Sequence, residues 1–153
     1  MTNERKGSIL VAVQFLLLAT IAFMPRFGDF VIPGLAYLIG KLLFIVGLFG
    51  MFWSFRSLGP SLTANPVPLE AGALVTTGAY AKVRHPIYLF LLVMTLGMTL
   101  SHGSLLRLVF WLLLVALLQY KMRWEETLLR AKYPTYSQYQ NEVPALLPRV
   151  LPR

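Results

Sequence analysis

The sequence contains no cysteine, and only 13% of its 153 residues are charged. The absence of cysteine excludes disulfide bonds and thiolate chemistry. A typical soluble chain is about 25% charged, so the low charge argues against a soluble globular domain. Hydrophobic residues make up 57% of the chain, and its mean hydropathy is +0.65. We therefore expect an integral membrane protein of one domain.

Acidic residues are also scarce, since 6 Asp and Glu stand against 14 Lys and Arg, which gives a net charge of +8. Such an excess can indicate a nucleic-acid partner. Here the basic residues flank apolar runs and form no dense cluster. That distribution favours anchoring at the membrane interface and attraction to anionic lipids. We expect membrane lipids, and no nucleic acid, as partners.

Four apolar runs approach or reach the roughly 17 to 25 residues that a helix needs to cross a bilayer. They occupy residues 8–24, 34–55, 86–100 and 105–120. Beyond residue 120 we expect the fourth helix to leave the membrane, break near Pro134 and give way to an amphipathic helix. The predicted fold class is an all-α integral membrane protein with about four transmembrane helices plus a cytosolic C-terminal helical extension.

The expected single domain, residues 1–153, divides into four parts. These are the first two spans (1–55), a cytosolic loop (56–85), spans three and four (86–122) and a cytosolic C-terminal segment (123–153). The basic start before the first apolar run also fits a signal peptide. Because Ala19 and Ala22 lack the A-x-A spacing of a cleavage site, a retained helix is favoured.

The distribution of Lys and Arg predicts the orientation in the membrane. Four spans place both termini and the 56–85 loop on one side, together with 11 basic residues. The opposite turns hold only Arg26 and Arg107. The positive-inside rule therefore predicts cytoplasmic termini and a cytoplasmic loop.

Two polar clusters are expected on this same face. One precedes and opens the third span, and consists of Tyr80, Arg84, His85 and Tyr88. The other follows the fourth span, and consists of Lys121, Arg123, Glu125 and Glu126. Spans three and four are antiparallel neighbours joined by a tight turn, so the clusters should meet. A structural alternative stays open, because Lys121 with Glu125 and Glu126 with Arg130 have the spacing of ordinary helix salt bridges.

Pro86 follows His85 where the third span begins. Proline is favoured at the first helical position, and the residue before it is pushed out of the α region. We therefore expect irregular backbone over residues 80–85 and a helix N-terminus at Pro86. Such a terminus carries about half a positive charge and several free N–H groups. Together with Arg84, it suits a carboxylate or another anion.

Residues 74–80 (LVTTGAY) and 83–88 (VRHPIY) resemble the core of the isoprenylcysteine carboxyl methyltransferase family. So do residues 125–129 (EETLL), followed by Y-x-x-Y at 136–139 and Val-Pro at 143–144. The related phospholipid N-methyltransferases share the paired glutamates. The resemblance covers roughly half of the chain.

Members of this family are membrane enzymes that use S-adenosylmethionine, and the resemblance implies that cofactor here. The residues that it implies for cofactor binding are Val75, Tyr80, His85, Pro86, Tyr88 and Glu125. The helix-start argument adds Arg84, for the cofactor carboxylate. The family's substrate-side arginine corresponds to Lys121, and we expect Lys121 and Arg123 to orient an anionic acceptor. No metal site is expected.

The expected function is methyl transfer at the membrane surface to a lipophilic or lipidated acceptor, with an isoprenylcysteine-like carboxylate favoured. A carboxylate needs no general base, whereas an amine needs one, for which Glu126 or His85 is nearest. The alternatives are phospholipid or small-amine N-methylation and a non-catalytic membrane scaffold or binder. A reductase of the sterol-reductase type is a weaker alternative, because it would need a nicotinamide cofactor and the sequence has no glycine-rich motif.

Overall fold

The computed structural model describes residues 2–25, 33–69 and 72–147. Within these ranges the chain forms five α-helices and two short 3₁₀ turns. The helices are α1 (Asn3–Phe23), α2 (Gly34–Leu58), α3 (Pro86–His102), α4 (Leu105–Lys132) and α5 (Tyr136–Glu142). The 3₁₀ turns, η1 (Gly59–Ser61) and η2 (Gly78–Ala81), lie between α2 and α3.

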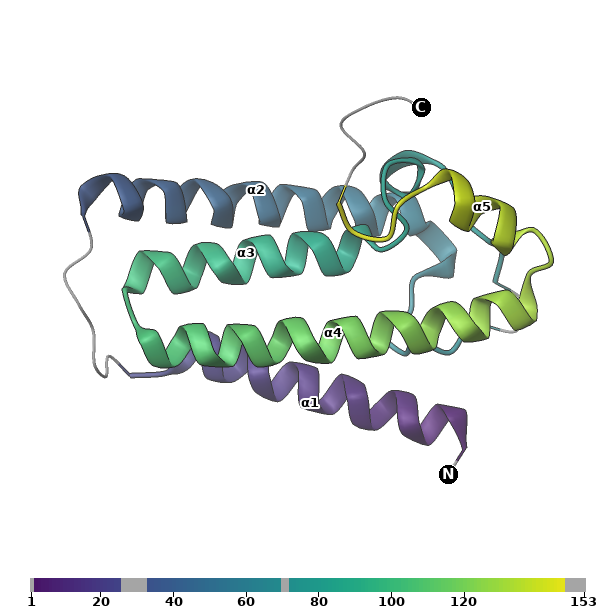
Figure 1. Cartoon of the computed structure of the whole chain (residues 1–153), viewed down its shortest axis with the longest axis horizontal. Coiled ribbons are helices and arrows are strands. Elements are labelled where there is room, and N and C mark those ends of the chain that lie inside the picture. The colour runs from purple at the N-terminus through teal and green to yellow at the C-terminus, as the bar shows by residue number, and fades with distance from the viewer. Residues whose placement is uncertain (1, 26–32, 70–71, 148–153) are drawn as a thin grey trace.

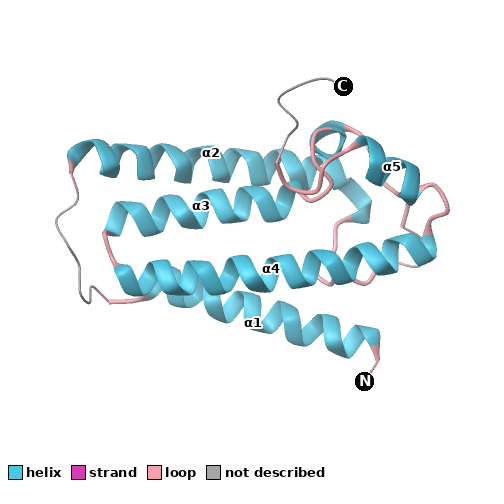
Figure 2. Cartoon of the chain, in the orientation of Figure 1, coloured by secondary structure: helices cyan, strands magenta, loops and turns pink. Residues whose placement is uncertain are grey.

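The four long helices lie side by side, with α2 packed on α3 and α1 packed on α4 (Figure 1). A turn at Gly103, whose φ of 59° is left-handed, joins α3 to α4. The short helix α5 and the non-helical segments on either side of η2 gather at the opposite end of the bundle (Figure 2). We call this the polar end, because both polar clusters of the sequence lie there.

Helices α2 and α3 pack backbone against backbone. A Cβ added to Gly47 would lie 2.5 Å from the backbone nitrogen of Met94, and one added to Gly97 would lie 2.5 Å from that of Phe44. No side chain fits at such separations. Small residues of this kind let helices approach closely in a membrane, where dispersion contacts supply much of the attraction.

Polar contacts join α1 to α4 at both of their ends. Towards the polar end, the Lys6 ammonium lies 4.5 Å from the ring centre of Trp124 in a cation–π contact. At the other end, the buried Arg107 guanidinium donates hydrogen bonds to the carbonyl oxygens of Ile21 (2.9 Å) and Met24. Carbonyls at a helix C-terminus lack intrahelical partners, so Arg107 caps α1.

The predicted membrane class is confirmed. Among the described helices, α1, α2 and α4 are long and apolar enough to cross a membrane, and α3 is a shorter apolar helix of 17 residues. As expected, α4 runs past the apolar run, ends before Pro134 and is followed by α5.

One local expectation needs correction, since the backbone around Tyr80 is not wholly irregular. Tyr80 lies in η2, where its N–H donates to the carbonyl of Thr77 (3.1 Å). Gly78 opens this turn with a left-handed φ of 61°, a conformation that glycine adopts without a steric penalty. The turn buries the Tyr80 side chain.

Candidate active site

A cavity of about 510 Å³ opens at the polar end of the bundle. All five α-helices and the segment between α2 and α3 contribute to its lining. Small-molecule sites commonly measure about 300–1,000 Å³, so the cavity is large enough for a nucleoside-sized ligand. Seven predicted site residues line it: Val75, Tyr80, Arg84, His85, Tyr88, Lys121 and Glu125. The other three, Pro86, Arg123 and Glu126, do not.

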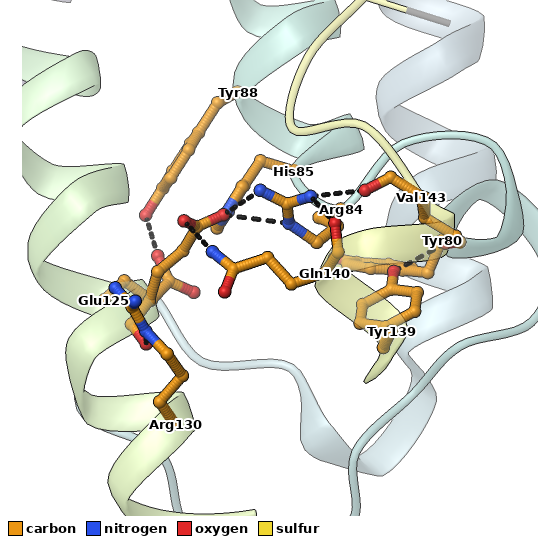
Figure 3. Close-up of polar contacts among 10 residues, drawn as sticks. Tyr80, Arg84, His85, Tyr88, Glu125, Arg130, Tyr139, Gln140 and Val143 are labelled. Atoms are coloured by element: carbon orange, nitrogen blue, oxygen red, sulfur yellow. Dashed lines mark hydrogen bonds and ion pairs between the residues drawn. The ribbon is translucent and has the colours of Figure 1, made fainter. Parts of the chain in front are cut away.

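Glu126 is the centre of a buried ion-pair cluster (Figure 3). Its Oε1 accepts hydrogen bonds from Nε (2.9 Å) and Nη2 (2.7 Å) of Arg84 and lies 3.1 Å from Nε2 of His85. Its Oε2 accepts from the side-chain amide of Gln140 (2.8 Å). The remaining Arg84 nitrogen, Nη1, donates to the backbone carbonyls of Gln140 (3.0 Å) and Val143. Every polar atom of the Arg84 and Glu126 side chains is thus engaged within the protein.

The backbone just before α3 is bonded to the segment that follows α5. The N–H groups of Arg84 and His85 donate to the carbonyls of Pro144 (2.9 Å) and Ala145 (3.0 Å). The sequence assigned the Arg84 guanidinium, together with the N-terminus of α3, to a cofactor carboxylate. This guanidinium is engaged within the protein, and the N–H groups of Arg84 and His85 hold the C-terminal segment over the start of α3.

Glu125, the residue before Glu126, lines the cavity instead. Its Oε2 accepts a hydrogen bond of 2.6 Å from the Tyr88 hydroxyl. The Tyr88 ring lies parallel to that of His85, with centroids 5.5 Å apart. Consecutive helical residues point about 100° apart. One carboxylate therefore joins the cluster while its neighbour faces the cavity.

Lys121 lies one helical turn before Glu125, and its side chain is buried. Its Nζ donates to Oε1 of Gln14 (2.8 Å) and, more weakly, to the carbonyl of Ala64 (3.4 Å). The same ammonium lies 5.3 Å from the ring centre of Tyr88. Helix α1 thus supplies a polar side chain to a site that the sequence placed on spans three and four.

The two salt bridges within α4 that the sequence spacing allowed, Lys121 with Glu125 and Glu126 with Arg130, do not form. The Glu126 carboxylate pairs with Arg84 across the bundle, so Nε of Arg130 donates to the backbone carbonyl of Glu126 (3.1 Å). Lys121 turns towards α1 rather than pairing with Glu125. In both cases a partner distant in sequence replaces the neighbour one turn away.

Arg123 is exposed and lies outside the cavity. It is two residues from Lys121, which rotates it about 200° around the helix. The structure does not bring Arg123 to the acceptor position that was predicted from the sequence. Pro86 is buried at the first position of α3, where it fixes the helix start behind the cavity wall.

Gln14 and Tyr136 are among the polar side chains of the lining to which the sequence assigned no role. Tyr136 is 1% exposed, and its hydroxyl has no hydrogen-bond partner among the described residues. The Arg84 guanidinium lies near enough to act on its pKa, but not in hydrogen-bonding geometry. Only weak sequence signals could have identified these two residues as part of the site. Gln14 is one of two polar residues in an apolar run, and Tyr136 opens the Y-x-x-Y motif.

Burial raises the pKa of the tyrosine hydroxyls at the polar end. For Tyr80 the Glu125 carboxylate adds to the effect of burial. For Tyr139, burial raises the pKa to about 12, although the Arg84 guanidinium opposes it. Both phenols are therefore protonated donors at neutral pH, and Tyr139 uses its proton to bond the carbonyl of Tyr80 (2.6 Å).

A family model described as phospholipid methyltransferase matches residues 35–136, which is more than half of the chain. This chain belongs to the phospholipid methyltransferase family. The family consists of membrane methyltransferases, and the match contains both polar clusters. It leaves out all of α1, including Gln14.

Two curated proteins are similar to this membrane methyltransferase over 98% of its length. One is the nickel-cobalt-cadmium resistance protein NccN of Alcaligenes xylosoxydans xylosoxydans, 26% identical over 155 residues. The other is the cobalt-zinc-cadmium resistance protein CzcN of Cupriavidus metallidurans, 28% identical over 155 residues. The alignments cover 67% and 66% of these proteins, so the chain spans about two thirds of their length.

The two tyrosines of α5 should respond differently to removal of the hydroxyl. Tyr139→Phe should lower stability by about 0.5–1.5 kcal/mol, because it deletes a buried hydrogen bond. Tyr136→Phe should leave stability unchanged or raise it, since the hydroxyl that it removes is buried without a partner. Thermal unfolding of both variants in the same detergent measures the difference. Equal losses would contradict this description of α5.

Proposed function

We propose that this family member transfers a methyl group from S-adenosylmethionine to a lipophilic acceptor at the membrane surface, with an acidic acceptor favoured. The observation that carries the proposal is one cavity lined by both a carboxylate and an ammonium. Glu125, Tyr88 and His85 form a first wall, and the Lys121 ammonium lies beside it, 5.3 Å from the ring centre of Tyr88.

The first wall fits the adenosyl cofactor in both size and chemistry. Tyr80, Tyr88 and His85 offer ring faces, and Val75 adds an apolar contact at the cavity edge. Glu125 gives one carboxylate oxygen to Tyr88, and the other accepts no hydrogen bond from the described residues. That second oxygen suits a ribose hydroxyl or an amino group. The partnerless Tyr136 hydroxyl supplies a further polar contact.

When bound, the cofactor supplies a methyl group that its sulfonium already activates, so the protein need not provide a covalent nucleophile. The chain's own residues hold and align the two reactants. Holding reactants in line can remove several kcal/mol from a barrier. The Glu126 cluster fixes the cofactor wall. The position of Lys121 beside this wall sets the direction in which the acceptor meets the cofactor.

The engagement of both base candidates favours an acidic acceptor over an amine. Both oxygens of Glu126 accept hydrogen bonds, and Glu126 does not line the cavity. Nε2 of His85 is directed to Glu126 as well. An amine acceptor must lose a proton, and both of these groups already hold hydrogen bonds within the cluster. A carboxylate acceptor needs no such base, and the Lys121 ammonium can orient it.

The second candidate is N-methylation of a phospholipid or a small amine, which the description of the matched family favours. The names of the two relatives refer to resistance to metals. In the described part of the chain, no three His, Asp or Glu side chains gather as metal ligands. On the positive-inside rule, we place the polar end and its cavity in the cytoplasm.

Binding of S-adenosylhomocysteine, the demethylated product of the cofactor, tests the cofactor wall. Glu125→Gln should weaken binding by about 10- to 100-fold, because a hydrogen bond to a charged group contributes about 1.5–3 kcal/mol. The control is Glu142→Gln, on the exposed side of α5 outside the cavity, which should bind as the wild type does. Calorimetric titration in detergent measures both. Absence of binding by the wild type would favour a non-catalytic binder or scaffold.

The fate of a labelled methyl group separates the two enzymatic candidates. The protein is incubated with a membrane lipid extract and methyl-labelled S-adenosylmethionine, and the lipids are then treated with mild base. We expect most of the label to be released as volatile methanol, because carboxyl methyl esters hydrolyse under conditions in which N-methyl groups are stable. Non-volatile label recovered on an amine head group would decide for N-methylation.

A further inference from the structure

The Lys121 ammonium is a buried cation that faces the cavity. The residue is 2% exposed, and its Nζ contacts the Gln14 amide oxygen, the Ala64 carbonyl and the face of the Tyr88 ring. All three contacts are with neutral groups. Within the part of the chain that the structure describes, no carboxylate lies at ion-pair distance from this ammonium.

Burial of an ammonium with no carboxylate in direct contact costs several kcal/mol, even though the Glu125 carboxylate lies near enough to act on it electrostatically. An anion bound directly to Lys121 in the cavity would complete the arrangement. An ammonium has three N–H donors, of which two are directed to Gln14 and Ala64. One donor is left for a ligand in the cavity that Lys121 lines.

The two N-terminal helices give the cavity an apolar side. Helix α1 contributes Val11, Phe15 and Leu18 to the lining, and α2 contributes Met51, Phe55 and Leu58. Both helices are long and apolar enough to cross a membrane. A ligand that fits both the ammonium and its surroundings has an anionic head and a hydrocarbon body.

We propose that Gln14 is a positioning residue that holds Lys121 for the anionic group of a membrane-derived acceptor, a carboxylate or a phosphate oxygen. This inference rests on the function proposed above. The uncharged amide oxygen fixes the ammonium without neutralising it. A carboxylate at the same position would form an internal ion pair and occupy the charge that the acceptor needs.

The inference also gives α1 a part in substrate choice. Gln14 lies outside the region that matches the family model, whereas the residues of the cofactor wall from Val75 to Glu125 lie inside it. The matched region would then form the cofactor site, and Gln14 of α1 would help to select the acceptor head group.

The test compares acceptor-like amphiphiles of one chain length in binding to the full protein saturated with S-adenosylhomocysteine. The probes are palmitate, hexadecyl phosphate and the neutral hexadecanol, titrated in a non-ionic detergent. The wild type should bind at least one acidic probe about tenfold more tightly than the alcohol, and the stronger of the two acids identifies the head group. Equal binding of all three probes would overturn the inference.

Variants then isolate the role of Gln14. Gln14→Glu should abolish the preference for the acid, and Gln14→Met should reduce it, while the affinity for the alcohol is unchanged. The control Lys6→Gln removes a different contact between α1 and α4, outside the cavity, and should keep the full preference. In a Lys121→Met background, Gln14→Glu should have no further effect on the preference.

A retained acid preference in Gln14→Glu, lost only with Lys121→Met, would show that Lys121 acts without Gln14 and would overturn the inference. S-adenosylhomocysteine affinity is measured in each variant as an independent readout. It should not change, because the hydrogen bond of Gln14 is to Lys121 and not to a residue assigned to the cofactor. If the wild type does not bind this nucleoside, the proposed function fails, whereas a failed acid preference with intact nucleoside binding refutes only the role of Gln14.

Discussion

The Glu126 carboxylate, held between Arg84 and His85, is the interaction on which the polar end depends. It joins α4 to the start of α3, and the same Arg84 guanidinium bonds the carbonyls of Gln140 and Val143 beyond. Removal of one partner from a buried ion pair typically costs about 3–5 kcal/mol. Three separate stretches of backbone, namely α4, the start of α3 and the segment from Gln140 to Val143, therefore meet around one carboxylate.

Because of this constraint, the adjacent residues Glu125 and Glu126 have different roles. Because Glu126 is fixed by the cluster, Glu125 is rotated into the cavity, where Tyr88 holds one of its oxygens. Lys121, one turn earlier on the same face, brings a positive charge to the same cavity, beside the Tyr88 ring. A single helix thus provides a structural carboxylate, a ligand-facing carboxylate and a ligand-facing ammonium within six residues.

The sequence predicted much of this arrangement for physical reasons that are local. Apolar run lengths gave the helices, Pro86 gave the start of α3, and the antiparallel α3–α4 turn brought the two clusters together. The sequence did not predict which residues pair within the two clusters. Lys121 bonds a residue 107 positions away and Glu126 one 42 positions away. Local spacing identifies only the possible partner one helical turn away. In the structure, a buried partner from another element forms the hydrogen bond instead.

Hydrogen–deuterium exchange of Glu126→Gln tests most directly whether this carboxylate holds the site together. Its readout is the protection of peptides covering residues 82–88 and 140–147, which the Arg84 and His85 amides connect through Pro144 and Ala145. Removal of the charge should make both peptides exchange several-fold faster, while peptides from the α2–α3 interface keep their wild-type rates. Wild-type exchange in both peptides would contradict the account, because the start of α3 and the C-terminal segment would then stay together without the ion pair.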